Sequence, residues 1–198
     1  MKKILLASRN TDKIQEVVAM LKGTDFELVT LDAFPDVPDV GEPALTFEGN
    51  AIIKAMIVGR KTEMLTIADD SGIEVDALGG HPGVFSARYA SGTNEDRCRK
   101  LLKEIANVPE GERGAQFHAV IALFDPVSEK IRTYEGIQRG RLLREFRGGN
   151  GFGYDPIFFS DEMGKTNAEM TQEEKNAVSH RGKALRKALE ILRELYPV

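Results

Sequence analysis

The chain of 198 residues has a single cysteine, Cys98, and no long hydrophobic run. One cysteine excludes an intramolecular disulfide, which suits a reducing compartment. No apolar stretch approaches the roughly 20 residues that a membrane-spanning helix needs. The basic start, Met1-Lys2-Lys3, is followed by only four apolar residues, too few for the core of a signal peptide. We therefore expect a cytoplasmic protein with no membrane partner.

The chain also has no excess of basic residues. Its 27 Lys and Arg residues face 31 Asp and Glu residues, for a formal net charge of −4. A general polyanion binder relies on many basic contacts that release counterions, so we expect no nucleic-acid partner. A small anionic ligand held in one local basic pocket is compatible with this charge.

Two common nucleotide-binding motifs are missing as well. The sequence has no Gly-x-x-x-x-Gly-Lys-Ser/Thr P-loop and no dinucleotide fingerprint. The segment Gly148–Gly153 is rich in glycine, but it does not lie between a strand and a helix as those motifs require. No second His or Cys lies near His81, so the sequence shows no zinc site. A nucleotide site in this chain would be built from other loops.

The length and the hydrophobic pattern predict one mixed α/β domain over residues 1–198, with one or two hairpins. Short apolar or alternating runs predict strands over 3–7, 26–31, 65–68, 115–125, 130–141 and 157–159. Apolar residues spaced by three and four predict helices over 12–21, 46–62, 95–106, 171–179 and 182–196.

Two adjacent carboxylates, Asp69 and Asp70, follow the apolar strand 65–68 and precede Ser71-Gly72. Neighbouring strand residues point to opposite faces, so we expect the two aspartates to differ in role. A carboxylate at the end of a buried strand is a common metal ligand or general base, and Mg²⁺ prefers oxygen ligands. The alternative is an Asx-turn with ordinary turn residues. This segment alone leaves both interpretations open.

Two lysines lie in segments suited to phosphates. Residues 8–13 form a strand, polar loop and helix N-terminus, which presents backbone N–H groups to an anion. Lys13 falls in the first helical turn, where the helix dipole disfavours a cation unless an anion is nearby. Lys54 shares a helix face with Asn50, four residues earlier. Solvated surface lysines are the alternative.

Loops that are distant in sequence can converge at the strand ends of an α/β sheet. The polar loops of this chain together supply carboxylates for a divalent cation, lysines for phosphates and aromatic rings for a flat base. This set fits a nucleoside triphosphate with Mg²⁺.

These segments resemble the inosine triphosphate/xanthosine triphosphate pyrophosphatase family, which removes non-standard purine nucleotides from the pool. The matching segments run nearly end to end in the sequence: Ser8–Lys13, Thr46-Phe47, Asn50-Ala51, Lys54-Ala55, Ala68–Gly72, Leu78–Gly80, Pro82-Gly83, Ser86–Tyr89, Phe152–Pro156 and Ser179–Arg181. Any one of these segments alone would be weak evidence, whereas all of them in this order form a specific pattern.

The resemblance implies an elongated, two-lobed α/β fold with a long mixed central sheet flanked by helices, a cleft between the lobes, and a homodimer. It implies Mg²⁺-dependent hydrolysis of the triphosphates of inosine, deoxyinosine and xanthosine (ITP, dITP and XTP) to the monophosphate and pyrophosphate. Asp70 matches the general base and a metal position, and Glu42 matches a second metal position. The resemblance places substrate contacts at Ser8, Arg9, Asn10, Thr11, Asp12, Lys13, Lys54 and Ser71, and base contacts at Phe152, Gly153, Tyr154, Asp155, Lys175, His180 and Arg181.

One position departs from the family pattern. The family usually has Glu-Asn-Ala after Thr-Phe-x, whereas this chain has Gly49 before Asn50-Ala51 and Glu48 one place earlier. Glu48 points about 100° away on the helix, so we do not expect it to replace that glutamate. Two other functions remain open: a pyrophosphatase for modified pyrimidine or methylated nucleotides, and a nucleotide-sensing module without turnover.

Overall fold

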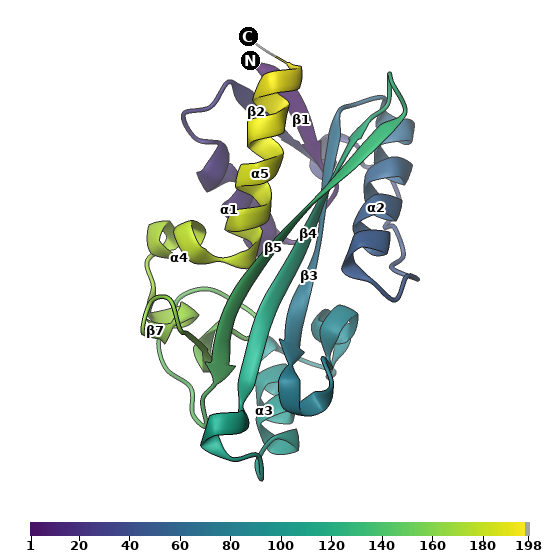
Figure 1. Ribbon diagram of the computed structural model, residues 1–198. Coiled ribbons are helices and arrows are strands. Elements are labelled where there is room, and N and C mark those ends of the chain that lie inside the picture. The colour runs from purple at the N-terminus through teal and green to yellow at the C-terminus, as the bar shows by residue number, and fades with distance from the viewer. Residues whose placement is uncertain (197–198) are drawn as a thin grey trace. The chain divides into compact units, whose positions relative to one another are not determined.

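The computed structural model describes residues 1–196 and contains a seven-stranded sheet flanked by helices (Figure 1). The strand order is β2-β1-β3-β4-β5-β6-β7. Strand β1 pairs in parallel with β2 and β3, whereas β6 pairs antiparallel with β5 and β7. The sheet is therefore mixed, which confirms the expected fold class. No helix among the described residues is long and apolar enough to cross a membrane.

Most predicted elements are present, with ends that shift by a residue or two. The strands are β1 (Lys2–Leu6), β2 (Phe26–Thr30), β3 (Thr66–Val75), β4 (Gly114–Asp125), β5 (Lys130–Leu142), β6 (Phe158–Ser160) and β7 (Lys165–Thr166). The helices are α1 (Thr11–Leu21), α2 (Phe47–Thr62), α3 (Asn94–Glu104), α4 (Gln172–Val178) and α5 (His180–Leu195). The sequence pattern does not predict β7 or the 3₁₀ helices, which include η3 (Gly83–Arg88) and η6 (Asn167–Glu169).

Strand β3 corrects one prediction. The strand that we expected to end before Asp69 continues through both aspartates and Ser71 to Val75. Asp, Ser and Gly are typical of turns and are depleted in strands. Here both carboxylates are buried and have partners, described below, so tertiary contacts override the local preference.

The chain forms two compact units. Unit 1 contains Met1–Asp70, Ala119–Gly136 and the segment that begins at Arg181, and unit 2 contains Ser71–His118 and Ile137–His180. Each unit is described separately below.

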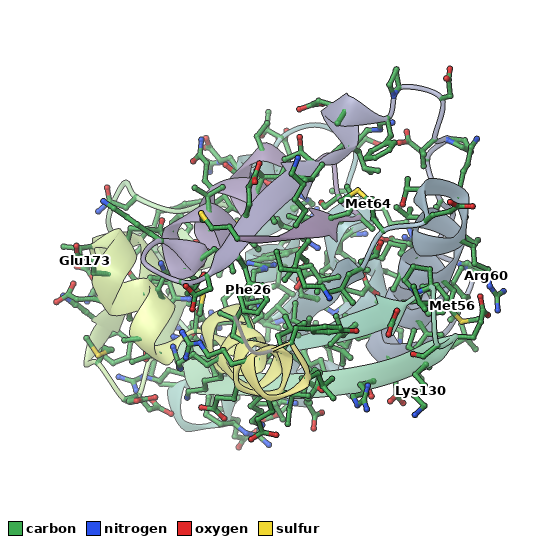
Figure 2. The ribbon with its side chains drawn as sticks, turned by 90° about the horizontal axis from the view of Figure 1, so that it is seen from above. Phe26, Met56, Arg60, Met64, Lys130 and Glu173 are labelled. Atoms are coloured by element: carbon green, nitrogen blue, oxygen red, sulfur yellow. The ribbon has the colours of Figure 1, made fainter. Side chains whose placement is uncertain are left out.

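The hydrophobic core of unit 1 lies between its strands and the helices α1 and α5. Ile4 of β1 and Ile67 of β3 pack in this core with Leu185 of α5, and Phe26 of β2, labelled in Figure 2, belongs to the same cluster. These side chains are almost completely buried. One face of the unit 1 strands is therefore covered by α1 and α5.

Helix α2 packs on the other face of these strands. A Cβ added to Gly59 of α2 would come within 2.5 Å of the Phe124 ring and 3.2 Å of Thr66 Oγ1. Thr66 and Ile67 are neighbours in β3 and point to different helices, as strand alternation requires. The same alternation applies to the two aspartates that follow.

Unit 2 has its own core, which includes Ile73, Leu101, Phe117 and Phe158. The Arg113 side chain is also buried, at 1% exposure. Its guanidinium donates to three backbone carbonyls, those of Ile105, Leu142 and Leu143. Arg113 therefore ties the end of α3 to the end of β5 through hydrogen bonds, without a carboxylate partner among these contacts.

Candidate active site

The Asp69 carboxylate lies on the α1 and α5 side of β3, in a buried cluster of four charged groups. Arg181 Nε and Nη2 each donate to Asp69 across 3.2 Å, and Lys13 Nζ pairs with the same carboxylate. Arg181 Nη1 also pairs with Glu16 of α1. The cluster joins β3, α1 and α5 and contains two cations and two anions.

The electrostatics of this cluster favour the charged forms of Asp69 and Arg181 and oppose that of Lys13. Burial alone would raise the pKa of Asp69, but the Arg181 and Lys13 cations hold that pKa far below its usual range. Burial lowers the pKa of Lys13, although Asp69 opposes that shift. Burial likewise opposes the charge of Arg181, yet Asp69 and Glu16 raise its pKa. The cluster is stable because each buried charge has an opposite partner.

The Asp70 carboxylate lies on the opposite side of β3, against α2. Its Oδ2 accepts a hydrogen bond from Asn50 Nδ2 across 3.1 Å, and its Oδ1 lies 3.2 Å from Lys54 Nζ. Asn50 and Lys54 therefore share a helix face, as their spacing predicted. Lys54 Nζ also donates to the Asp69 backbone carbonyl across 2.7 Å. These contacts fix the position of Asp70 relative to α2.

Glu42 joins this group from the loop before α2. Its Oε1 lies 2.9 Å from Lys54 Nζ, so Glu42 and Asp70 share one ammonium. Asn50 holds the same loop, because its side chain exchanges hydrogen bonds with the backbone N–H and C=O of Ala44. Glu42 and Asp70, the two expected metal positions, therefore both contact Lys54, and their role as metal ligands stays a prediction.

The surroundings of Asp70 shift the pKa of its carboxyl group. Burial and the neighbouring Glu42 raise its pKa, while Lys54 opposes that rise. A raised pKa makes a carboxylate a stronger base. Burial also opposes the charge on Lys54, but Asp70 and Glu42 outweigh it and raise the pKa of this lysine.

Two carboxylates with a shared position for a cation match the oxygen ligands that Mg²⁺ prefers, since Mg²⁺ is commonly held by one or two carboxylates plus phosphate oxygens. Glu48, the residue beside the Gly49 departure, accepts a hydrogen bond from Thr133 Oγ1 across 2.7 Å. Among residues 1–196 no group of three or more His, Cys, Asp or Glu side chains is arranged to hold a metal.

The loop 8–13 is organised by its own polar groups. Asn10 caps α1, because its Oδ1 accepts from Lys13 N across 3.0 Å, and Ser8 Oγ accepts from Asn10 N across 3.2 Å. Thr11 and Asp12 begin the helix. The Arg9 side chain is directed elsewhere, since it pairs with Asp39 and donates to the Val37 carbonyl. Of the side chains in this loop, Lys13 is the one that the structure brings to the carboxylates of β3.

In unit 2, Asp155 and Lys175 form a buried ion pair. Lys175 Nζ lies 2.6 Å from Asp155 Oδ2, and the two residues are each 3% exposed. The same Oδ2 accepts from the Phe152 backbone N–H across 2.8 Å. The ammonium also lies 4.5 Å from the centroid of the Phe152 ring. Three of the predicted base-binding residues therefore meet in one place.

The glycine-rich loop that carries these residues is anchored at several points. Backbone N–H groups of Gly149 and Asn150 donate to the Ala168 carbonyl of η6 across 3.1 and 3.0 Å. Tyr154 Oη donates to the Ser86 carbonyl of η3 across 2.8 Å. Tyr154 is only 4% exposed and its ring packs in the core of unit 2, and its contact with a base stays a prediction. Phe152 is the aromatic residue of this loop that remains half-buried.

Three further predicted site residues, His180, Gly153 and Ser71, lie in unit 2. The His180 ring stacks on Phe117, with centroids 4.8 Å apart and planes 10° apart. Cys98 Sγ lies 3.3 Å from the Gly153 carbonyl, and burial raises the pKa of this thiol to about 12. The cysteine is therefore a buried, structural thiol. Ser71 follows Asp70 in β3 and is half-buried.

The sequence reasoning missed several polar residues of these clusters. Asn50 was noted for its helix face and its place in a matching segment but not as a partner of Asp70, and Glu16 was not singled out. Gln138 and Asn167 gave no local signal, yet both are completely buried beside Asp155. A buried polar residue of a strand or turn can be assigned to such a cluster only when its hydrogen-bond or ion-pair partner is known.

The chain is similar to known proteins over nearly its whole length. The model of the Ham1 family matches residues 4–191. A dITP/XTP pyrophosphatase of Desulforamulus reducens is 46% identical over 196 residues, which cover 98% of this chain and 97% of that protein. Another of Symbiobacterium thermophilum is 48% identical over 191 residues, or 96% of this chain and 95% of that protein.

Solved structures show the same fold. The HAM1 protein of Coxiella burnetii has a TM-score of 0.88 and 41% identity, with 98% of this chain and 100% of that chain covered. The Ham1 protein of Staphylococcus aureus has a TM-score of 0.86 and 36% identity, with 98% and 99% covered. With a family model that matches nearly the whole sequence and relatives of this similarity over their full length, the chain belongs to the Ham1 family.

Proposed function

We propose that this protein hydrolyses non-standard purine nucleoside triphosphates, such as ITP, dITP and XTP, to the monophosphate and pyrophosphate. The carrying observation is the buried Asp70 carboxylate, which Asn50 holds in place beside Lys54 and Glu42. The relatives named dITP/XTP pyrophosphatase support the same reaction. The cleft, the homodimer and the cytoplasmic location that we expected stay predictions.

In the proposed reaction Asp70 orients a water molecule and takes its proton as the water attacks phosphorus. Burial and Glu42 raise the pKa of this carboxyl group, which suits a base that must accept a proton. Asn50 holds one carboxylate oxygen, so the other oxygen keeps a fixed direction. Lys54 and Lys13 supply positive charge for the phosphates, because charge accumulates on the leaving pyrophosphate.

Glu42 and Asp70 would hold a Mg²⁺ ion together with phosphate oxygens. When bound, the ion would supply charge that stabilises the leaving group and helps to align the phosphates. Both carboxylates already face one cation, the Lys54 ammonium. We propose that Lys54 turns from these carboxylates towards a phosphate when the substrate complex forms.

The Asp155–Lys175 pair supplies a basis for selecting the base. A 6-oxopurine presents an acceptor at O6 and a donor at N1–H, whereas adenine presents a donor at its 6-amino group and an acceptor at N1. We propose that the Lys175 ammonium donates to O6 and that Asp155 accepts from N1–H. Adenine would face both groups with the wrong partner, and a buried unpaired polar group costs about 1–3 kcal/mol.

Arg181 was expected at the base. Its Nε, Nη1 and Nη2 atoms instead contact Asp69 and Glu16, so we assign O6 recognition to Lys175. A direct role of Arg181 in base binding stays a prediction. The contacts described here support a role for Arg181 in holding Asp69.

The test is a substrate panel with detection of pyrophosphate. Purified protein is incubated with the triphosphates of inosine, xanthosine, guanosine, adenosine and a methylated pyrimidine nucleoside, each with and without Mg²⁺. We expect turnover of the inosine and xanthosine substrates, release of pyrophosphate and not of phosphate, and loss of turnover when EDTA removes the metal. The exposed Asp36→Asn variant serves as a control for a changed carboxylate in unit 1.

Two results would contradict the proposal. Preferred turnover of the methylated pyrimidine substrate would favour a different pyrophosphatase. Tight binding of inosine triphosphate without Mg²⁺-dependent turnover would indicate a nucleotide-sensing module.

A further inference from the structure

A closed pair of amide side chains lies directly behind the Asp155 carboxylate in unit 2. Gln138 Nε2 donates to Asn167 Oδ1 across 2.8 Å, and Asn167 Nδ2 donates back to Gln138 Oε1 across 3.1 Å. Asn167 Nδ2 also donates to Asp155 Oδ1 across 3.2 Å. Gln138 and Asn167 are each 0% exposed. The chain of contacts therefore runs from β5 through η6 to the carboxylate.

The carboxylate fixes which way each amide points. Asp155 is acceptor-only when ionised, so Asn167 must present its NH₂ group to it. That choice directs Asn167 Oδ1 towards Gln138, which must then donate with its own NH₂ group. Reversal of Asn167 would place its amide oxygen against the Asp155 carboxylate oxygen, and reversal of Asn167 alone would also place its oxygen against that of Gln138. One rotational arrangement of the three side chains is therefore strongly preferred.

The two oxygens of Asp155 have separate partners. Oδ1 takes the Asn167 hydrogen bond, and Oδ2 takes those of Lys175 and the Phe152 backbone. The Asn167 contact thus sets the rotation of the carboxylate plane, while the ammonium and the loop backbone are held on its other side. A hydrogen bond to a charged group is stronger than one between neutral groups, so this constraint is substantial.

We propose that Gln138 and Asn167 are positioning residues that set the orientation of the Asp155–Lys175 pair for recognition of the 6-oxopurine base. This inference rests on the proposed function. Neither amide needs to touch the nucleotide. Asn167 acts through Asp155, and Gln138 acts one step further away, by holding Asn167.

A purely structural role makes a different prediction. Buried amide pairs also stabilise a fold, and removal of one partner leaves the other unsatisfied. Such a loss would lower stability or the amount of folded enzyme and would affect all substrates equally. A positioning role changes the ratio of kcat/KM for inosine triphosphate to that for adenosine triphosphate, because only the former uses the oriented pair.

The experiment compares Gln138→Leu and Asn167→Leu with a matched control, Gln116→Leu. Gln116 lies in β4 of the same unit, and its Nε2 donates to Glu74 at 2.5 Å, outside the Asp155 network. We expect both test variants to lower kcat/KM for inosine triphosphate by about 10- to 100-fold, mainly through KM, with little change for adenosine triphosphate. The control should keep the wild-type ratio.

Three further measurements make the outcome decisive. In an Asp155→Asn background, Gln138→Leu should produce no additional loss of selectivity, because the charged acceptor that the amide pair orients is already lost. Gln138→Asn, which retains an amide, should keep more selectivity than Gln138→Leu. Crystal structures of Gln138→Leu and Asn167→Leu should show a rotated Asp155 carboxylate, and this readout does not depend on turnover.

Equal losses for both substrates, an additive effect in the Asp155→Asn background, or an unmoved carboxylate would overturn the inference. Failure of the proposed function is a separate result. It would appear as absence of inosine triphosphate hydrolysis by the wild-type protein, whereas the carboxylate orientation would still be measurable in the crystals.

Discussion

Asp69 and Asp70 are adjacent in β3, yet their carboxylates lie on opposite faces of the strand. Asp69 accepts from Arg181 of α5, and Asp70 accepts from Asn50 of α2. The alternation of side chains along a strand produces this division without any turn or bulge between them. One carboxylate is thereby enclosed among matched charges, and the other lies beside Lys54 and Glu42, where the proposed chemistry requires a base.

Asp70→Asn should lower kcat for inosine triphosphate by about 10²- to 10⁴-fold, the range typical of a lost general base. The amide is similar in size, and burial and Glu42 already oppose the charge of Asp70, in contrast to Asp69, so the thermal midpoint should change little. Steady-state kinetics with pyrophosphate detection measures the effect. A variant that keeps more than about half of the wild-type kcat would remove Asp70 from this role.

Asp69→Asn should instead act mainly on stability. The change leaves Arg181 and Lys13 buried with only Glu16 as an anionic partner in this cluster. Breaking a buried ion pair by removing one partner costs about 3–5 kcal/mol. Urea unfolding should show this loss in the free energy of unfolding, and Asp36→Asn, at an exposed site, should show almost none. A loss below about 1 kcal/mol would contradict the assignment.

The same carboxylate predicts acid sensitivity. The pKa of Asp69 in the folded protein lies far below its unfolded value of about 3.9. The unfolded chain therefore binds more protons at acid pH, and stability rises with pH through this window. The contribution of Asp69 is complete above about pH 5 and falls away as the pH drops below about 4. The free energy of unfolding, measured between about pH 3 and 7, should change less with pH for Asp69→Asn than for the wild type.

Lys175→Met should reduce selectivity for the base. Loss of the ammonium removes the proposed donor to O6, and kcat/KM for inosine triphosphate should fall at least about tenfold more than that for adenosine triphosphate. The ratio of the two values is insensitive to the fraction of folded enzyme. Lys103→Met, at an exposed position of α3, is the control for a lost charge in unit 2. An unchanged ratio would exclude Lys175 from base recognition.

Gly49→Ala should destabilise the protein although alanine is the better helix former. A Cβ at this position would lie 2.7 Å from Ala44 Cβ and 3.0 Å from Thr46 Oγ1, so the loop before α2 would have to move. Overpacking of this kind costs about 1–3 kcal/mol, more than the roughly 1 kcal/mol gained in helix propensity. Chemical denaturation measures the balance. Gly41→Ala, where nothing lies within 4 Å of an added Cβ, should be close to neutral.

Local signals predicted the helices and most strands well. Thr171 and Glu174 form the capping box that begins α4, and Thr46 caps α2 as expected. The predicted end of β3 was wrong, because the run Asp69-Asp70-Ser71 has the composition of a turn but lies within the strand. It stays in the strand because residues from α1, α2 and α5 neutralise the two carboxylates, and that contribution is not visible in a local window.

Some contacts of the candidate site could be predicted, because certain residue types are unfavourable at their positions unless a partner lies nearby. Lys13 in the first turn of a helix was expected beside a phosphate; the structure places the Asp69 carboxylate there, and the phosphate contact stays a prediction. Tyr154 was expected to offer a ring to a base, but its hydroxyl and ring are buried against unit 2. Gln138 and Asn167 could not be paired from the sequence, because 29 residues separate them and neither lies in a motif.

The Arg181 contacts also constrain the order in which the chain can complete its structure during synthesis. Arg181 is 165 residues from Glu16 and 112 residues from Asp69. Both segments of unit 2, Ser71–His118 and Ile137–His180, have therefore been synthesised before this arginine is added. The N-terminal part of the nascent protein must keep two acidic side chains without their guanidinium until residue 181 has been added. Unit 1 therefore contains both the first and the last synthesised of the described segments, so its Arg181 contacts cannot form before those segments are both present.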